Sequence, residues 1–254
     1  MSSTRRVSVD SHRPASYSRH CAASESAAED SQRNAPCEPT SNDRDKKKFV
    51  PLDSPKFYRS TVDTEFRVWE FPGLLSEEEC RILIESGGGR WQRSRVQKAN
   101  KGDSGLSDYR TSSTTWIDPS KDLSAAGRVC LKIRGYAKMI TGIEDFERLA
   151  TSELQLVKYE EGQEYKAHYD GRMLPDGTLE SRGTFLVYLN DGFEGGETYF
   201  PNVGIKVKPE RGKAILWYTH LTSEGIEDSR SKHAGLPVKE GEKYLCTQWF
   251  SLPA

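Results

Sequence analysis

Two histidines and one aspartate are the residues in this chain most able to do chemistry. His168 and Asp170 lie two residues apart in the segment YKAHYDGR, and His233 lies in SKHAGLPV. Two imidazoles and one carboxylate form the facial triad that binds non-haem Fe(II) and leaves half of its coordination positions open. On one strand, residues two apart point to the same face. The three residues are therefore candidate iron ligands, although an H-x-D pair also occurs in turns and strands that bind no metal.

A lysine near the end of the chain is a candidate anion-binding residue. After His233 the sequence contains no arginine, and its cations are Lys239 and Lys243. Lys239 flanks a Glu-Gly turn signal, which predicts exposure to solvent. Lys243 begins the apolar segment KYLCTQWF, and an ammonium buried in such a strand needs an anionic partner. Without the histidines and the aspartate, the default interpretation of Lys243 would be a surface lysine at the start of a strand.

The blocks around these residues follow a recognisable order. They are VKYEEGQEYKAHYD, RGTFLVYLNDGFEGGETYFP, GKAILWYT and HAGLPVKEGEKYLCTQWF. This order resembles the catalytic domain of the prolyl 4-hydroxylase family of Fe(II)- and 2-oxoglutarate-dependent dioxygenases. The resemblance is close over residues 154–250 and extends more loosely back to DYRTSSTTWI at 108–117. Several ordered blocks must agree at once, so the signal is specific.

The resemblance implies a reaction and a set of roles. Fe(II) would be bound by His168, Asp170 and His233, and Lys243 would bind the distal carboxylate of the cosubstrate 2-oxoglutarate. With O2, and ascorbate as reductant, the expected reaction hydroxylates a peptidyl proline, as procollagen-proline 4-dioxygenases do, and releases succinate and CO2. The family's pocket positions match four further residues. Tyr159, Thr184 and Trp249 would contact the cosubstrate, and Arg110 would contact the substrate. Taken alone, these four are as well explained by strand packing or, for Arg110, by a solvated ion pair.

Helical patterns precede a series of short β-rich segments. Ser76 and Glu79 form a capping-box pattern for a helix that glycines 87–89 end, and Leu123–Gly142 shows helical spacing. RTSSTTWI is β-prone, and from Glu153 onward ELQLVKYE, GTFLVYLN, GIKVKP, KAILWYT and EKYLCTQWF predict strands. This order predicts an α+β fold. The resemblance implies a double-stranded β-helix, or jelly roll, with supporting N-terminal helices.

Composition divides the chain into a tail and one domain. Residues 1–48 are polar, end in DRDKKK and contain almost no large apolar side chains, which predicts a disordered tail. Residues 49–254 are expected to form the dioxygenase domain, with its core at 153–252. Within it, the polar segment Gln97–Asp108 predicts a surface loop that is able to close over a site as a lid.

Charge and cysteine content limit the partners and the compartment. With 254 residues and a net charge of −1, the chain gives no reason to expect a nucleic-acid partner, and no apolar run approaches the roughly 20 residues of a membrane helix. Five scattered cysteines favour a reducing compartment. No signal-peptide core lies near Met1, which favours the cytoplasm, while the Arg- and Ser-containing start is compatible with organelle targeting. Nothing in the sequence sets the oligomeric state.

Other functions remain open at the level of sequence. A hydroxylase of a free amino acid or a lysyl residue would use the same iron site, and the shape of the pocket decides between them. Nucleic-acid dealkylases also use it, but they resemble one another in an arginine pair after the distal histidine, which is missing here. A jelly-roll binding module is the non-enzymatic alternative, against which the complete triad and Lys243 argue. The chain has no room for the peptide-binding domains of animal collagen hydroxylases, which favours a Pro-rich cellular or wall protein over collagen as substrate.

Overall fold

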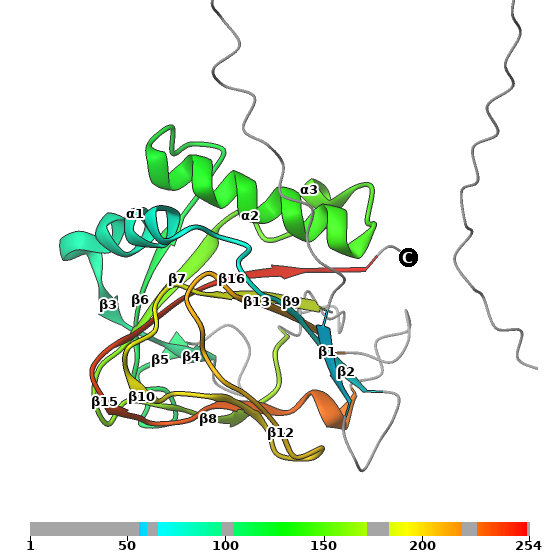
Figure 1. Cartoon of the computed structure of the whole chain (residues 1–254). Coiled ribbons are helices and arrows are strands. Elements are labelled where there is room, and N and C mark those ends of the chain that lie inside the picture. Colours follow the sequence, from blue (N-terminus) through cyan, green and yellow to red (C-terminus); the bar gives the residue numbers. More distant parts are fainter. Residues whose placement is uncertain (1–55, 60–65, 98–103, 172–182, 220–227, 253–254) are drawn as a thin grey trace, which may run out of the picture. The chain divides into compact units, whose positions relative to one another are not determined.

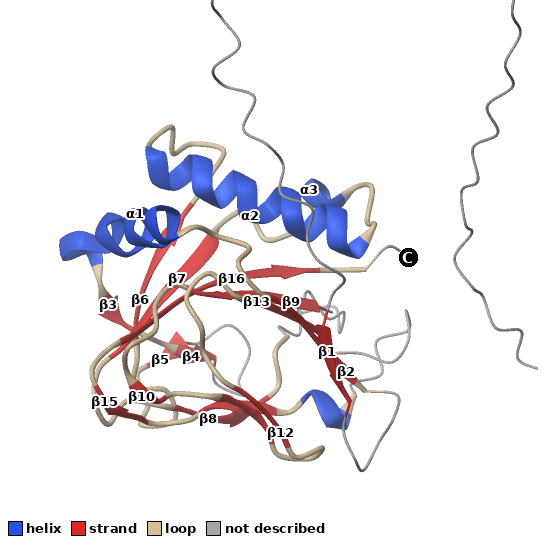
Figure 2. Cartoon of the chain, in the orientation of Figure 1, coloured by secondary structure: helices blue, strands red, loops and turns tan. Residues whose placement is uncertain are grey.

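The computed structural model describes residues 56–59, 66–97, 104–171, 183–219 and 228–252. These residues form mostly antiparallel sheets with few helices, as the α+β prediction requires in outline (Figure 2). The predicted tail at 1–48 lies outside the described residues. None of the described helices is long and apolar enough to cross a membrane.

The larger sheet has eight strands. In spatial order they are β1 (Lys56–Arg59), β2 (Arg67–Phe71), β13 (Ala214–Tyr218), β9 (Gly183–Tyr188), β16 (Lys243–Phe250), β7 (Leu154–Tyr159), β6 (Ser113–Ile117) and β3 (Gln92–Arg93). Neighbouring strands are antiparallel, and β16 lies between β9 and β7. The predicted strands of the C-terminal half are therefore confirmed, and four of them, β7, β9, β13 and β16, meet in this sheet.

A four-stranded sheet faces the larger one (Figure 1). Its order is β12 (Ile205–Val207), β11 (Thr198–Phe200), β14 (His233–Gly235) and β8 (Tyr165–His168). Two short pairs complete the strands, β10 (Glu194–Gly195) with β15 (Val238–Glu240) and β4 (Val96–Gln97) with β5 (Ser104–Gly105). The last pair occupies the ends of the predicted loop at Gln97–Asp108, whose centre at 98–103 lies outside the described residues.

The helices pack on one face of the larger sheet (Figure 2). They are α1 (Glu77–Gly87), α2 (Ala125–Thr141) and the short α3 (Phe146–Leu149), with 3-10 turns at Gly88–Arg90 and Ser229–Ser231. The predicted capping box at Ser76 is present in both directions, since its hydroxyl accepts from Glu79 N–H and the Glu79 carboxylate accepts from Ser76 N–H. Gly142 ends α2 with φ +68°, a left-handed conformation that glycine adopts without strain.

Two apolar clusters cover the two faces of the larger sheet. One joins the helices to the sheet and includes Leu83, Ile133 and Leu156. The other lies between the two sheets and includes Val157 and Trp217. Because the central strands are buried on both faces, their sequences are almost continuously apolar, and alternate residues face the helices or the space between the sheets. The candidate functional residues lie on the second face.

The three cysteines in the described ranges are buried and form no disulfide. Cys246 lies on β16 and packs as a small apolar residue in the cluster beneath the helices.

Candidate functional site

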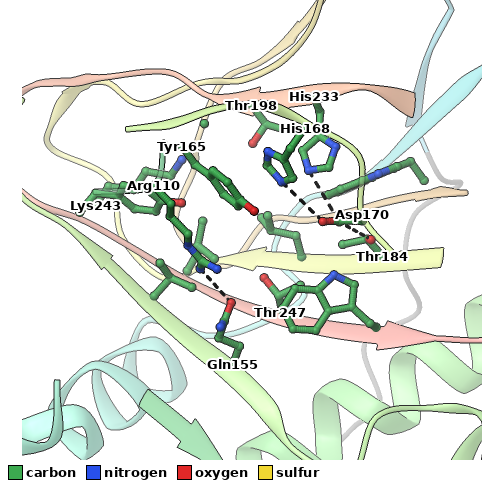
Figure 3. Close-up of a pocket in the computed structure, with 17 residues that line it drawn as sticks. Arg110, Gln155, Tyr165, His168, Asp170, Thr184, Thr198, His233, Lys243 and Thr247 are labelled. Atoms are coloured by element: carbon green, nitrogen blue, oxygen red, sulfur yellow. Dashed lines mark hydrogen bonds and ion pairs between the residues drawn. The ribbon is translucent and has the colours of Figure 1, made fainter. Parts of the chain in front are cut away.

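One pocket between the two sheets receives every residue that the sequence singled out (Figure 3). The pocket is narrow, with a volume of about 50 Å³. Its lining includes eight predicted residues, contributed by β7, β8, β9, β14, β16 and the segments that follow β5 and β8: Arg110, Tyr159, His168, Asp170, Thr184, His233, Lys243 and Trp249. The fold therefore brings together residues up to 139 positions apart, Arg110 and Trp249.

Three side chains converge at one end of this pocket. His168 ends β8 and His233 begins β14, and the two residues are paired across the smaller sheet. Asp170 Oδ1 lies 3.5 Å from His168 Nε2, and Asp170 Oδ2 lies 3.6 Å from His233 Nε2. All three ligand atoms lie within 4.8 Å of one another. This is the arrangement that a facial triad requires.

A hydrogen bond from Nδ1 to a backbone carbonyl oxygen fixes the orientation of each imidazole. His168 Nδ1 lies 2.8 Å from the carbonyl oxygen of Lys166, and His233 Nδ1 lies 3.0 Å from that of Ser231. A carbonyl oxygen can only accept a hydrogen bond, so Nδ1 carries the proton in each ring. In the neutral ring this tautomer leaves the lone pair of each Nε2 facing Asp170, which is the state that a metal-binding imidazole needs.

The expectation that His168 and Asp170 share one strand is wrong. β8 ends at His168, and Asp170 lies in the segment beyond it. Its carboxylate reaches the two histidines from this irregular segment, and Gly171, the next residue, has φ +138°, a conformation that favours glycine. Thr184, opposite on β9, donates its hydroxyl to Asp170 Oδ2 at 2.7 Å and holds the carboxylate in this position.

Burial and neighbouring charges set the protonation of the cluster. Burial lowers the pKa of His233 to about 4, with the nearby His168 adding to the effect, so the imidazole is neutral at physiological pH. Burial alone would raise the pKa of Asp170. The neighbouring imidazoles of His233 and His168 and the hydroxyl of Thr184 outweigh the effect of burial, and the pKa of Asp170 falls below its ordinary value. The neutral imidazole of His233 and the ionised carboxylate of Asp170 are the species that ligate a divalent cation.

Lys243 lies in the same pocket at a separate position. Its side chain is 1% exposed, which confirms the prediction of a buried lysine. Nζ donates to the carbonyl oxygen of Gly196 at 2.6 Å and lies 5.1 Å from the ring of Tyr159 and 5.7 Å from that of Tyr188. Within the described ranges, no carboxylate forms an ion pair with it. Burial lowers its pKa to about 7, partly offset by Glu197. The pocket thus offers an incoming anion a buried amine without a carboxylate partner.

Arg110 is the second buried cation of the pocket. It is 8% exposed, and its guanidinium donates to Ser112 Oγ and Gln155 Oε1, both at 3.0 Å. No ion pair holds it within the part of the chain described, so the expectation of a solvated salt bridge does not apply. Arg110 also borders a second, wider groove, which places it between the pocket and the surface.

The wider groove continues from the pocket toward solvent. Its volume is about 580 Å³, and it shares Arg110, His168, Asp170 and Trp249 with the narrow pocket. Its wall is aromatic: Tyr109 and Trp116 are 42% and 41% exposed, and Trp116 lies 6.1 Å from Trp249 between ring centroids. A small ligand fits the inner pocket, and a larger ligand can reach the histidines from the groove.

Sequence reasoning missed several residues of the pocket. They are Gln155, Tyr165, Thr198, Trp217 and Thr247. The signal for two of them was present, because strand residues two apart share a face. Counting by two from Tyr159 on β7 reaches Gln155, and counting from Lys243 on β16 reaches Thr247 and then Trp249. Tyr165, Thr198 and Trp217 carried no such signal.

The donor set fits iron. Adjacent ligands of an octahedral divalent ion at about 2.1 Å would lie about 3 Å apart. Asp170 Oδ1 and Oδ2 lie 3.5 and 3.6 Å from the two imidazoles and all three ligand atoms lie within 4.8 Å, so the cluster would contract around the ion. Two imidazoles and one carboxylate leave positions open for a chelating ligand.

Known proteins with similar sequences point the same way. The model of the 2OG-Fe(II) oxygenase superfamily matches residues 154–251. Prolyl 4-hydroxylase 2 from Arabidopsis thaliana is 34% identical over 223 residues, which cover 74% of this chain and 68% of that relative. Prolyl 4-hydroxylase subunit alpha-2 from Gallus gallus is 31% identical over 194 residues. The matched region covers 72% of this chain and 34% of that subunit.

Solved structures agree with the sequence comparison. The 2OG complex of the viral collagen prolyl hydroxylase from Paramecium Bursaria Chlorella virus-1 has a TM-score of 0.56 and 28% identity, and the match covers 73% of this chain and 96% of the viral one.

Proposed function

Because this chain belongs to the prolyl 4-hydroxylase family of Fe(II)- and 2-oxoglutarate-dependent dioxygenases, we propose that it hydroxylates the ring of a proline residue in a peptide or protein, with release of succinate and CO2. The observation that carries this proposal is the meeting, in one pocket, of a His-Asp-His cluster and a buried lysine that has no carboxylate partner within the described ranges. The first can hold the metal and the second can hold a dicarboxylic cosubstrate.

Fe(II) and 2-oxoglutarate are the cofactors of this family, and O2 and ascorbate are typical of it. We assign the metal to His168, Asp170 and His233. When bound there, Fe(II) supplies the oxidising chemistry that couples decarboxylation of 2-oxoglutarate to hydroxylation. The chain itself orients the two imidazoles through their Nδ1 hydrogen bonds and the carboxylate through Thr184.

We assign the distal carboxylate of 2-oxoglutarate to Lys243. The distal carboxylate would provide the anion that this buried amine lacks among its described neighbours, and the contact would restore its charge. Tyr159 lies beside Lys243, with Nζ 5.1 Å from the centroid of its ring, and we assign its hydroxyl to the same carboxylate as a second donor. Thr184 and Trp249 are the other two lining residues that we assign to the cosubstrate, and they lie on neighbouring strands on the side of Asp170, to which Thr184 donates.

The peptide would occupy the wider groove, with Arg110 at its inner end. The aromatic wall supports this assignment, because a proline-containing peptide is already extended as a polyproline II helix and packs well against aromatic side chains. The predicted lid at Gln97–Asp108 borders this groove through Ser107. Its central residues lie outside the described ranges.

The strand order supports a double-stranded β-helix as the finer description of the fold. The order β13-β9-β16-β7 faces β12-β11-β14-β8, so the chain passes back and forth between two antiparallel sheets, with β11 and β12 as successive strands of the smaller one. We propose that residues 49–254 form this single dioxygenase domain with its core at 153–252, and that residues 1–48 are a tail outside it.

Succinate formation tests the proposal directly. Purified full-length protein with Fe(II), 2-oxoglutarate and ascorbate should release succinate much faster with a proline-containing peptide than with the same peptide carrying alanine instead. Stimulation by a free amino acid or a lysine peptide alone would assign the same iron site to a different substrate. No succinate under any condition would favour a binding module.

A further inference from the structure

Three side chains form a continuous stack that ends on one of the proposed metal ligands (Figure 3). The ring of Tyr165 lies parallel to the imidazole of His168, with centroids 3.5 Å apart and planes at 15°. Arg110 lies over the ring of Tyr165, with Cζ 4.8 Å from its centroid. Tyr165 therefore separates a buried cation from the imidazole.

Backbone and side-chain contacts fix the outer member of the stack. Arg110 pairs with Tyr165 in an isolated β-bridge, and Lys166 N–H donates to the carbonyl oxygen of Tyr109 at 2.9 Å. The guanidinium is itself anchored, since it donates to Ser112 and Gln155 at 3.0 Å. The segment that carries Arg110 is thus attached along β8, the strand that ends at His168.

The stack restrains a motion that the hydrogen bond of His168 leaves open. The bond from Nδ1 to the Lys166 carbonyl selects the tautomer, but one bond at the edge of a ring still permits tilting about that edge. A parallel aromatic face limits tilting. Among the residues that the structure describes, His233 has no parallel partner, since Trp217 meets it at 66° and Phe200 at 37°. A divalent cation draws electron density from its imidazole ligand, which strengthens the attraction to an electron-rich phenol ring.

We propose that Tyr165 and Arg110 are positioning residues for the metal, Tyr165 by stacking on His168 and Arg110 by holding Tyr165. This inference rests on the proposed metal site. Arg110 then has two roles: it holds Tyr165 even when no peptide is bound, and it makes the substrate contact that the sequence predicts. The ring of Tyr165, rather than its hydroxyl, is then the part that matters for metal affinity.

The test is the affinity of the full chain for Mn(II) alone, measured by calorimetry without cosubstrate or peptide. Tyr165→Phe keeps the ring and should bind Mn(II) as the unmodified chain does. Tyr165→Leu should bind about tenfold more weakly, the scale expected when a residue that orients a metal ligand is lost. Arg110→Gln should weaken binding about threefold, and this loss should disappear when it is combined with Tyr165→Leu.

A matched control lies outside the site. Tyr199 on β11 also carries a cation over its ring, Lys206 at 5.1 Å, and Tyr199→Leu should leave Mn(II) affinity unchanged. If Tyr165→Leu does not fold, as judged by circular dichroism, Arg110→Gln measured in the unmodified and Tyr165→Phe chains must still weaken binding in both.

The inference is overturned if Tyr165→Leu binds Mn(II) normally. It is also overturned if Arg110→Gln raises only the KM for peptide, or if its effect on Mn(II) is equally large without Tyr165. These outcomes leave the proposed function intact, because the unmodified chain would still bind Mn(II). Failure of the unmodified chain to bind Mn(II) would overturn both.

Discussion

Replacing Lys243 by methionine should weaken 2-oxoglutarate binding and leave metal binding almost unchanged. Methionine keeps an apolar chain of similar length in a position that is 1% exposed, and it removes the amine. The amine touches the Gly196 carbonyl and lies over two tyrosine rings, none of which carries a negative charge. The metal ligands at the other end of the pocket make no described contact with Lys243.

The size of the loss follows from the contact that would be removed. A hydrogen bond to a charged group contributes about 1.5–3 kcal/mol, and 1.36 kcal/mol corresponds to a tenfold change in affinity. The dissociation constant for 2-oxoglutarate should therefore rise about ten- to 150-fold. The protein without ligand should be as stable as before or more stable, since an incompletely paired buried amine is replaced by an apolar group. Lys243→Arg should restore only part of the affinity, because a planar fork does not replace a compact ammonium.

Calorimetric titration of 2-oxoglutarate into the Mn(II)-loaded protein, without O2, measures this loss. Lys239→Met is the matched control, since Lys239 is exposed on β15 and should not affect binding. The reasoning is refuted if Lys243→Met weakens Mn(II) and 2-oxoglutarate equally, or if it lowers the melting temperature while cosubstrate affinity is retained.

The same substitution predicts a change in pH dependence. Burial lowers the pKa of Lys243 to about 7, and contact with a carboxylate would raise it again. Binding therefore takes up a proton above pH 7, and affinity for 2-oxoglutarate should fall as pH rises from about 7 to 9, by at most tenfold per pH unit. Lys243→Met should abolish this dependence.

Three further predictions concern the metal, the groove and the tail. His168→Ala, Asp170→Ala or His233→Ala should each abolish 2-oxoglutarate turnover, and persistence of decarboxylation in the triple variant would contradict the metal assignment. Trp116→Ala should raise the KM for a proline-rich peptide severalfold and leave the KM for 2-oxoglutarate unchanged. Equal effects on both KM values would contradict the assignment of the peptide to the wider groove. Deleting residues 1–48 should change neither the melting temperature nor turnover with small substrates, and a clear loss of stability would show that the tail packs on the domain.

Sequence could predict the parts of the fold that depend on local pattern. The capping box at Ser76, the helix ended by Gly142 and the strands of the C-terminal half all follow from residues close together in the chain. Because side chains two residues apart on a strand share a face, Gln155 and Thr247 could also have been predicted as pocket residues. The short edge pairs such as β10 with β15 have two or three residues each, too few to leave a pattern.

The site was harder to predict where it depends on irregular segments and on the second sheet. The two-residue spacing of His168 and Asp170 suggested one strand, but β8 ends at His168 and the carboxylate comes from the irregular segment that follows. The stack of Arg110, Tyr165 and His168 depends on a bridge between segments 55 residues apart, Arg110 and Tyr165, which no local pattern encodes.

Mass spectrometry of a peptide product tests the central claim most directly. The full-length protein is incubated with Fe(II), 2-oxoglutarate, ascorbate and a panel of peptides and free amino acids, and each product is fragmented to locate any added oxygen. The account predicts one added oxygen on a proline ring within a peptide, formed together with succinate and absent with His233→Ala. Oxygen found only on free amino acids, on lysine or on a methylated base would contradict the proposed substrate.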